Sequence, residues 1–168
     1  IGEFLGELRD RCFKPHNCMT VAEAPGVPAD ELPDYIGENG YFSMIFDFSY
    51  ADMDVVPGGD WHHRRLFTAK EFRDTVFETQ LDLQKAGWGA NYLENHDQPR
   101  SLNKYLPEDS INYHSTTMLG TFYFFLRGTP YVYQGQELGM VNADWESIDA
   151  FDDIQTKDQY RRALAAGL

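Results

Sequence analysis

Short apolar segments alternate along this chain with longer segments whose apolar positions recur at helical spacing. A short apolar run predicts a β-strand that is buried on both faces. Four such runs lie at residues 19–22, 41–48, 89–93 and 131–133. Helical spacing predicts helices at residues 2–13, 28–36, 69–86 and 110–127. Strands that alternate with helices are typical of parallel βαβ units, so we predict an α/β fold.

The helix predicted at residues 69–86 has signals at both ends. Thr68 and Glu71 have the spacing of a capping box, in which each side chain accepts a hydrogen bond from a free backbone N–H of the other residue. Gly87 then predicts the end of the helix. Ser110 is the predicted N-cap of the next helix.

The length of the chain limits the architecture. With 168 residues and four predicted strands, the chain is well short of the roughly 250 residues typical of a closed eight-stranded barrel. It starts at Ile1 and stops at Leu168 within a helical pattern, so we expect a piece of a longer protein. Half a barrel would have two open sheet edges and uncovered apolar faces, which predicts homo-oligomerisation of the isolated piece.

The composition excludes several classes of partner. The chain has 14 Lys+Arg against 27 Asp+Glu, a net charge of −13, which argues against nucleic acid and anionic membranes. No apolar run is long enough for a membrane span, and two cysteines cannot form a disulfide framework, so we expect a cytoplasmic protein. Cys12, His16 and Cys18 fit no zinc pattern, and we predict no metal or cofactor. The basic residues of 62–65 are expected in a solvated loop.

Two carboxylates follow predicted strands. Glu23 follows the strand at 19–22, and Asp97 follows the strand at 89–93, with His96 beside it. One strand separates them, and alternate strands of a barrel contribute to the same layer, so both should point into one pocket. Convergent carboxylates suit glycosidic bond cleavage. The alternatives are a helix-capping role for Glu23 and an Asx turn for Asp97.

Three motifs in order carry a more specific resemblance. They are Thr20–Val27 (TVAEAPGV), Asn95–Arg100 (NHDQPR) and Gly128–Met140 (GTPYVYQGQELGM). The chain resembles the second half of the catalytic barrel of the alpha-amylase family, glycoside hydrolase family 13, in its oligo-1,6-glucosidase and alpha-glucosidase branch. The resemblance implies the C-terminal half of a (β/α)8 TIM barrel, roughly strands 5 to 8 with their helices. Residues 1–168 would then form part of one catalytic domain.

The resemblance also implies roles for four side chains. Glu23 would be the general acid/base, and Asp97 would stabilise the transition state. His96 would hydrogen-bond sugar hydroxyls, and Arg100 would steady nearby carboxylates or the substrate. The family's nucleophile, an Asp in a Gly-Phe-Arg-x-Asp motif, is absent from these 168 residues.

The expected activity follows from these roles. A retaining glycosidase needs a nucleophile as well as an acid/base, so we expect this chain alone to be inactive. The longer protein is expected to be a retaining alpha-glucosidase that acts on short oligosaccharides, with isomaltose-type alpha-1,6 links favoured. The alternatives are trehalose-6-phosphate hydrolase or a sucrose isomerase of the same branch. From another class, the alternative is a non-catalytic amylase-like binding protein.

Overall fold

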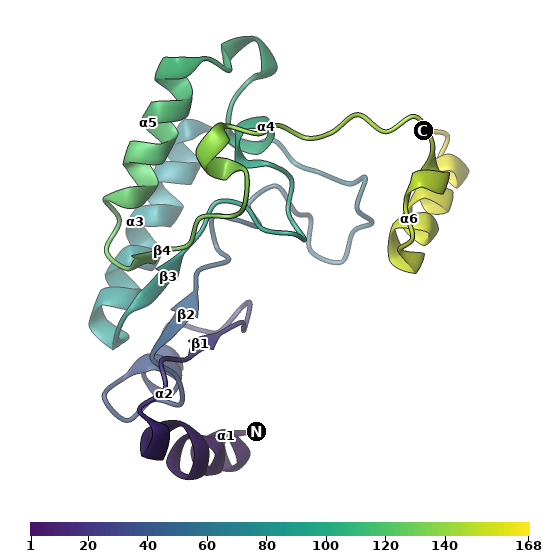
Figure 1. Ribbon diagram of the computed structural model, residues 1–168. Coiled ribbons are helices and arrows are strands. Elements are labelled where there is room, and N and C mark those ends of the chain that lie inside the picture. Colours follow the sequence, from purple (N-terminus) through teal and green to yellow (C-terminus); the bar gives the residue numbers. More distant parts are fainter.

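The computed structural model describes all 168 residues and contains one four-stranded parallel sheet (Figure 1). The strands pair in the order in which they occur along the chain, with Val21 opposite Met44, Ile45 opposite Gly89 and Ala90 opposite Thr129. They are β1 (Val21–Ala22), β2 (Met44–Phe46), β3 (Gly89–Asn91) and β4 (Thr129–Pro130). The α/β fold with a parallel sheet is therefore confirmed.

Helices cover the sheet and provide its core. Figure 1 shows α3 (Ala69–Ala86) and α5 (Tyr113–Phe124) lying along β3 and β4. One apolar cluster joins Val76 of α3 to Leu119 and Tyr123 of α5. A second cluster packs Ile36 of α2 (Leu32–Ile36) and Leu83 of α3 against the strands. The second cluster includes Ala22 of β1 and Ile45 of β2, so it joins the helices to the strands.

The capping box of α3 forms as predicted. Thr68 Oγ1 accepts a hydrogen bond from Glu71 N (3.1 Å), and the Glu71 carboxylate accepts one from Thr68 N (2.7 Å). These bonds satisfy two backbone donors that the first turn of a helix leaves unpaired. The helix ends at Ala86, directly before Gly87.

Other predicted boundaries were wrong by a few residues. The helix α5 starts at Tyr113 because Asn112, and not Ser110, accepts hydrogen bonds from the first backbone N–H groups. The helix expected at 28–36 is reduced to α2, which follows a turn. The first helix is α1 (Gly2–Leu8), and a wider π-helical segment follows it.

The last strand also lies earlier than predicted. The segment expected at residues 131–133 forms its ladder at Thr129–Pro130, with one further bond from Tyr131 N to Asn91 O (2.8 Å). The pairing partner β3 is short, and it therefore limits how far β4 extends.

The C-terminal helix α6 (Ile154–Ala165) lies apart from the sheet, at the end of an extended segment (Figure 1). It contacts the loop between β2 and α3. Gln159 Oε1 accepts a hydrogen bond from Trp61 N (2.9 Å), and Arg162 Nη1 pairs with Asp60 Oδ1 (3.1 Å). No helix in the chain combines the length and the apolar character that crossing a membrane requires.

Candidate active site

The predicted catalytic carboxylates lie at the carboxyl edge of the sheet. Glu23 directly follows β1, and Asp97 lies in the loop that follows β3. Because the strands are parallel, these two loops leave the sheet at the same edge. Both side chains are exposed, so a ligand can reach them.

The two carboxylates line two different cavities. Glu23 and Asn95 border a cavity of about 160 Å³ with an aromatic wall that includes Phe46 and Tyr92. Asp97 borders a second cavity of about 220 Å³, next to Gln98 and the loop between β2 and α3. The loop that follows β3 therefore contributes to both cavities, and the structure does not place Glu23 and Asp97 in one pocket.

Tyr92 lies near Glu23 and Asp97, and the sequence did not identify it as a site residue. It is 2% exposed, and its hydroxyl is buried without a hydrogen-bond partner. Burial raises its pKa above the usual value, and the negative charges of nearby carboxylates, including Glu23 and Asp97, raise it further. The phenol therefore stays protonated above the pH at which an exposed tyrosine ionises.

Asp47 is a second missed residue. It directly follows β2, the same position that Glu23 has after β1, and this position was the signal that could have found it. Asp47 is buried, and Oδ1 accepts a hydrogen bond from Ser49 N (3.0 Å), whereas Oδ2 has no partner. Its negative charge also raises the pKa of Tyr92.

A buried ion pair closes the loop that carries Asp97. Arg100 Nη1 donates to Glu94 Oε1 (2.7 Å), and Ser101 N, at the start of α4 (Ser101–Tyr105), donates to Glu94 Oε2 (2.6 Å). The Glu94 side chain is 1% exposed and that of Arg100 is 17% exposed. The two ends of the loop are therefore held together by one charged pair.

Arg100 also joins this loop to the segment after β4. Its Nη1 donates to Gln134 O (2.8 Å), and its guanidinium carbon lies 5.0 Å from the centre of the Tyr133 ring. The structure thus shows Arg100 steadying a carboxylate, Glu94. Direct contact between Arg100 and a substrate stays a prediction.

His96 and Asp97 lie at the tip of the loop. His96 Nε2 lies 3.2 Å from Asp97 Oδ2, and both side chains are exposed. Asn95, and not Asp97, forms the Asx turn, since Asn95 Oδ1 accepts the hydrogen bond from Asp97 N (2.9 Å). The Asp97 carboxylate is not used in the turn.

A buried lysine joins the same loop to the segment after β2. Lys104 Nζ donates to Gln98 Oε1 (2.6 Å) and lies 3.2 Å from Asp54 Oδ1, and Gln98 Nε2 donates to Asp52 Oδ1 (2.8 Å). The Lys104 side chain is 1% exposed. Burial lowers the pKa of Lys104, although the charge of Asp54 opposes this shift. The loop is thus anchored on both neighbouring segments.

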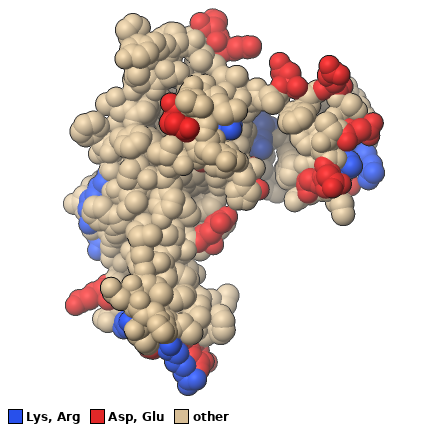
Figure 2. All heavy atoms as spheres, in the orientation of Figure 1, with Lys and Arg blue, Asp and Glu red and all other residues tan.

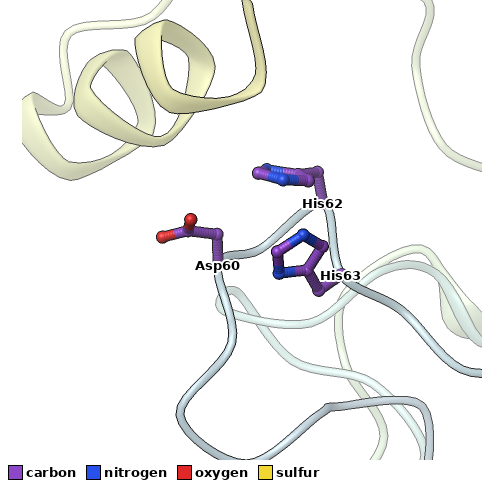
Figure 3. Close-up of side chains that lie close together, drawn as sticks. All are labelled: Asp60, His62 and His63. Carbon is purple, nitrogen blue, oxygen red and sulfur yellow. The ribbon is translucent and has the colours of Figure 1, made fainter. Parts of the chain in front are cut away.

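One cluster of residues has the chemistry of metal ligands. Asp60, His62 and His63 lie together in the loop between β2 and α3, and their ligand atoms lie within 4.8 Å of one another (Figure 3). The expectation of a solvated basic loop at 62–65 was wrong for His62, whose ring nitrogens are both buried. Arg64 and Arg65 pair with carboxylates of Asp54 and Glu71.

Basic side chains are scattered over the surface. On the face shown in Figure 2, Lys and Arg form small separate groups among acidic side chains. This distribution agrees with the net charge of −13.

The parallel sheet and the carboxylates at its edge agree with the sequence-based expectation, and comparison with known proteins identifies the family. Residues 1–165 match the family described as alpha amylase, catalytic domain. The chain belongs to the alpha-amylase family.

Individual relatives agree with this assignment. An oligo-1,6-glucosidase of Parageobacillus thermoglucosidasius is 36% identical over 165 residues, which are 98% of this chain and 29% of that protein. The crystal structure of Bacillus licheniformis trehalose-6-phosphate hydrolase superposes with a TM-score of 0.86 at 32% identity, over 99% of this chain and 30% of that one. Isomaltulose synthase of Klebsiella sp. LX3 has a TM-score of 0.86 at 25% identity, with the same coverage. The chain thus spans about three tenths of the length of these relatives.

Proposed function

We propose that this chain supplies the general acid/base, Glu23, and a transition-state-stabilising carboxylate, Asp97, of a retaining alpha-glucosidase that acts on short oligosaccharides with alpha-1,6 links. The observation that carries the proposal is the position of both carboxylates at the carboxyl edge of one parallel sheet. The similarity to oligo-1,6-glucosidases supports the substrate class.

The proposed reaction is a double displacement. Glu23 protonates the glycosidic oxygen as the bond to the sugar breaks, and later removes a proton from the water that attacks the glycosyl–enzyme intermediate. Asp97 stabilises the positive charge on the sugar ring, and His96 binds hydroxyl groups. These 168 residues form the C-terminal half of a (β/α)8 barrel in this proposal, and the nucleophile is provided by residues outside them. The chain by itself is then inactive.

The test is a Glu23→Gln variant of the protein that carries this chain. Loss of the proton donor is expected to lower kcat on isomaltose by about 10²–10⁴-fold. Glu31→Gln, a change at an exposed carboxylate at the far end of the same connection between β1 and α2, is the matched control and should keep full activity. Equal activity of Glu23→Gln and Glu31→Gln would contradict the acid/base assignment.

A second candidate is supported by the similarity to trehalose-6-phosphate hydrolase. The two candidates differ in the sugar that is cleaved, so rates on isomaltose, trehalose 6-phosphate and sucrose distinguish them. Highest kcat/KM on isomaltose supports the first proposal. Isomerisation of sucrose would indicate a sucrose isomerase, and sugar binding without turnover would indicate a non-catalytic relative.

A further inference from the structure

Three ligand-type side chains are gathered by one turn of the loop between β2 and α3. His63 N donates to Asp60 O (2.8 Å), which closes the turn. The rings of His62 and His63 lie with centres 4.1 Å apart. One ligand atom from each of the three side chains lies within 4.8 Å of the other two (Figure 3).

The His62 ring is the observation that points to a ligand. Its Nδ1 and Nε2 are both buried, and neither has a hydrogen-bond partner. An imidazole carries at least one N–H donor, and leaving a buried donor or acceptor unpaired is costly. A metal ion bonded to one of these nitrogens would satisfy it.

The helix α6 fixes the geometry of the turn. Arg162 Nη1 pairs with Asp60 Oδ1 at 3.1 Å, and Gln159 Oε1 accepts the hydrogen bond of Trp61 N. Carboxylates that bind metals are in turn hydrogen-bonded by a second set of groups, which orient them. Arg162 would orient the carboxylate of Asp60 in this way, because it contacts Oδ1 and leaves Oδ2 for a metal. Asp158 pairs with the same guanidinium (2.8 Å) and offsets its charge.

The cluster borders a space for further ligands. Asp60 and His63 line the cavity of about 220 Å³ that also contacts Asp97 and Gln98. A water molecule takes up about 30 Å³, so water can complete the coordination of an ion.

The donor set selects the kind of metal. Two imidazoles and one carboxylate, with water in the remaining position, are typical of open zinc sites, whereas Ca²⁺ and Mg²⁺ prefer oxygen ligands. Zinc–ligand bonds of about 2.0–2.2 Å at tetrahedral angles place two ligand atoms about 3.3–3.6 Å apart. The ligand atoms of the cluster lie within 4.8 Å of one another, so side-chain rotations that move them by up to about 1.5 Å would bring them to this spacing.

We propose that Asp60, His62 and His63 bind one zinc-type divalent metal ion, with water as the remaining ligand. None of the three side chains has a role in the proposed glucosidase chemistry, although the cavity that Asp60 and His63 line also contacts Asp97. Binding of the metal would tie α6 to the loop through Asp60 and Arg162.

The test is titration of the protein with Zn²⁺ alone, followed by calorimetry. Cys12 and Cys18 are free and exposed, so a Cys12→Ser/Cys18→Ser background prevents zinc binding to thiolates. We expect one zinc ion per chain in this background. The His62→Ala/His63→Ala variant should weaken binding at least 100-fold, and Arg162→Gln about 10–100-fold.

His16→Ala/His114→Ala is the matched control, since both of these imidazoles are exposed and lie outside the cluster. It should bind zinc as the background protein does. Co²⁺ gives a second measurement, since its visible absorption reports coordination by these ligands and should be lost in His62→Ala/His63→Ala. The proposal is overturned if the cysteine-free protein binds no zinc, or if the folded His62→Ala/His63→Ala variant, checked by circular dichroism, binds zinc unchanged.

Discussion

Glu94 is the residue on which the shape of the Asp97 loop depends. Its two carboxylate oxygens hold Arg100 at one end of the loop and the start of α4. A buried charge that loses its partner is strongly destabilising, because the remaining charge is left without compensation. The loop that presents His96 and Asp97 is therefore fixed at its base by these bonds, and only its tip is exposed.

Glu94→Gln is expected to lower the free energy of unfolding by about 3 kcal/mol, the lower end of the range for breaking a buried ion pair. Urea denaturation measures the change. Glu108→Gln, at an exposed carboxylate, is the control and should change stability by less than about 0.5 kcal/mol. A Glu94→Gln protein as stable as the control would show that the pair does not hold the loop.

Helix α3 and its neighbours show which elements a sequence determines locally. Both ends of α3 were predicted because Thr68, Glu71 and Gly87 act within the helix itself. The start of α5 was missed because Ser110 and Asn112 are both good caps, and only the observed bonds to Asn112 decide between them.

The short helix α4 was not predicted, and its cause is a tertiary contact. Its first backbone N–H is satisfied by Glu94, which lies outside the helix. The same reasoning applies to the candidate site. Glu23 and Asp97 were predicted as site residues from their positions after strands, and the structure places them there, whereas the contacts of Tyr92 and Glu94 depend on burial that no local pattern shows.

Replacing glycine with alanine at two positions in the helical layer should change the stability of the protein in opposite directions. A Cβ on Gly87 would overlap the Ile36 carbonyl oxygen, whereas a Cβ on Gly120 in α5 would meet nothing within 4 Å. We expect Gly87→Ala to lower the free energy of unfolding by about 1–3 kcal/mol, because α2 and α3 must move apart to make room for the methyl group. Gly120→Ala should raise the free energy of unfolding by roughly 0.5–1 kcal/mol, because alanine favours the helix more than glycine does. Thermal unfolding of both variants checks this, and equal shifts would contradict the close approach at Gly87.

The whole molecule is expected to lose stability in alkaline solution. Burial raises the pKa of Tyr123 to about 12, with a further contribution from the charge of Glu94, and burial also raises the pKa values of Tyr50, Tyr92 and Tyr105. The folded chain therefore holds protons that the unfolded chain releases near pH 10. Stability is fully present below about pH 10 and falls as the pH rises towards 12.

Urea midpoints between pH 8 and 12 measure this loss. Tyr123→Phe should make the urea midpoint fall less steeply with pH, because one of the groups with a raised pKa is removed. Tyr113→Phe is the control, since Tyr113 is exposed and should leave the slope unchanged. A midpoint that does not move with pH would contradict the expectation.

The exposed apolar surface bears on association of the isolated chain. Large apolar side chains such as Phe125, Leu138 and Trp145 are exposed, and the outer edges of β1 and β4 have no neighbouring strand. Such surfaces promote association. We expect sedimentation equilibrium to show oligomers, and a stable, well-folded monomer would contradict this prediction.

The order of the strands has a consequence for synthesis on the ribosome. Each strand pairs with the strand made just before it. The sheet can therefore grow strand by strand as the chain leaves the ribosome. The turn at Asp60 is different, because its partner Arg162 lies 102 residues later. This turn is therefore made before its anchor and reaches its final contact only after Arg162 has been translated.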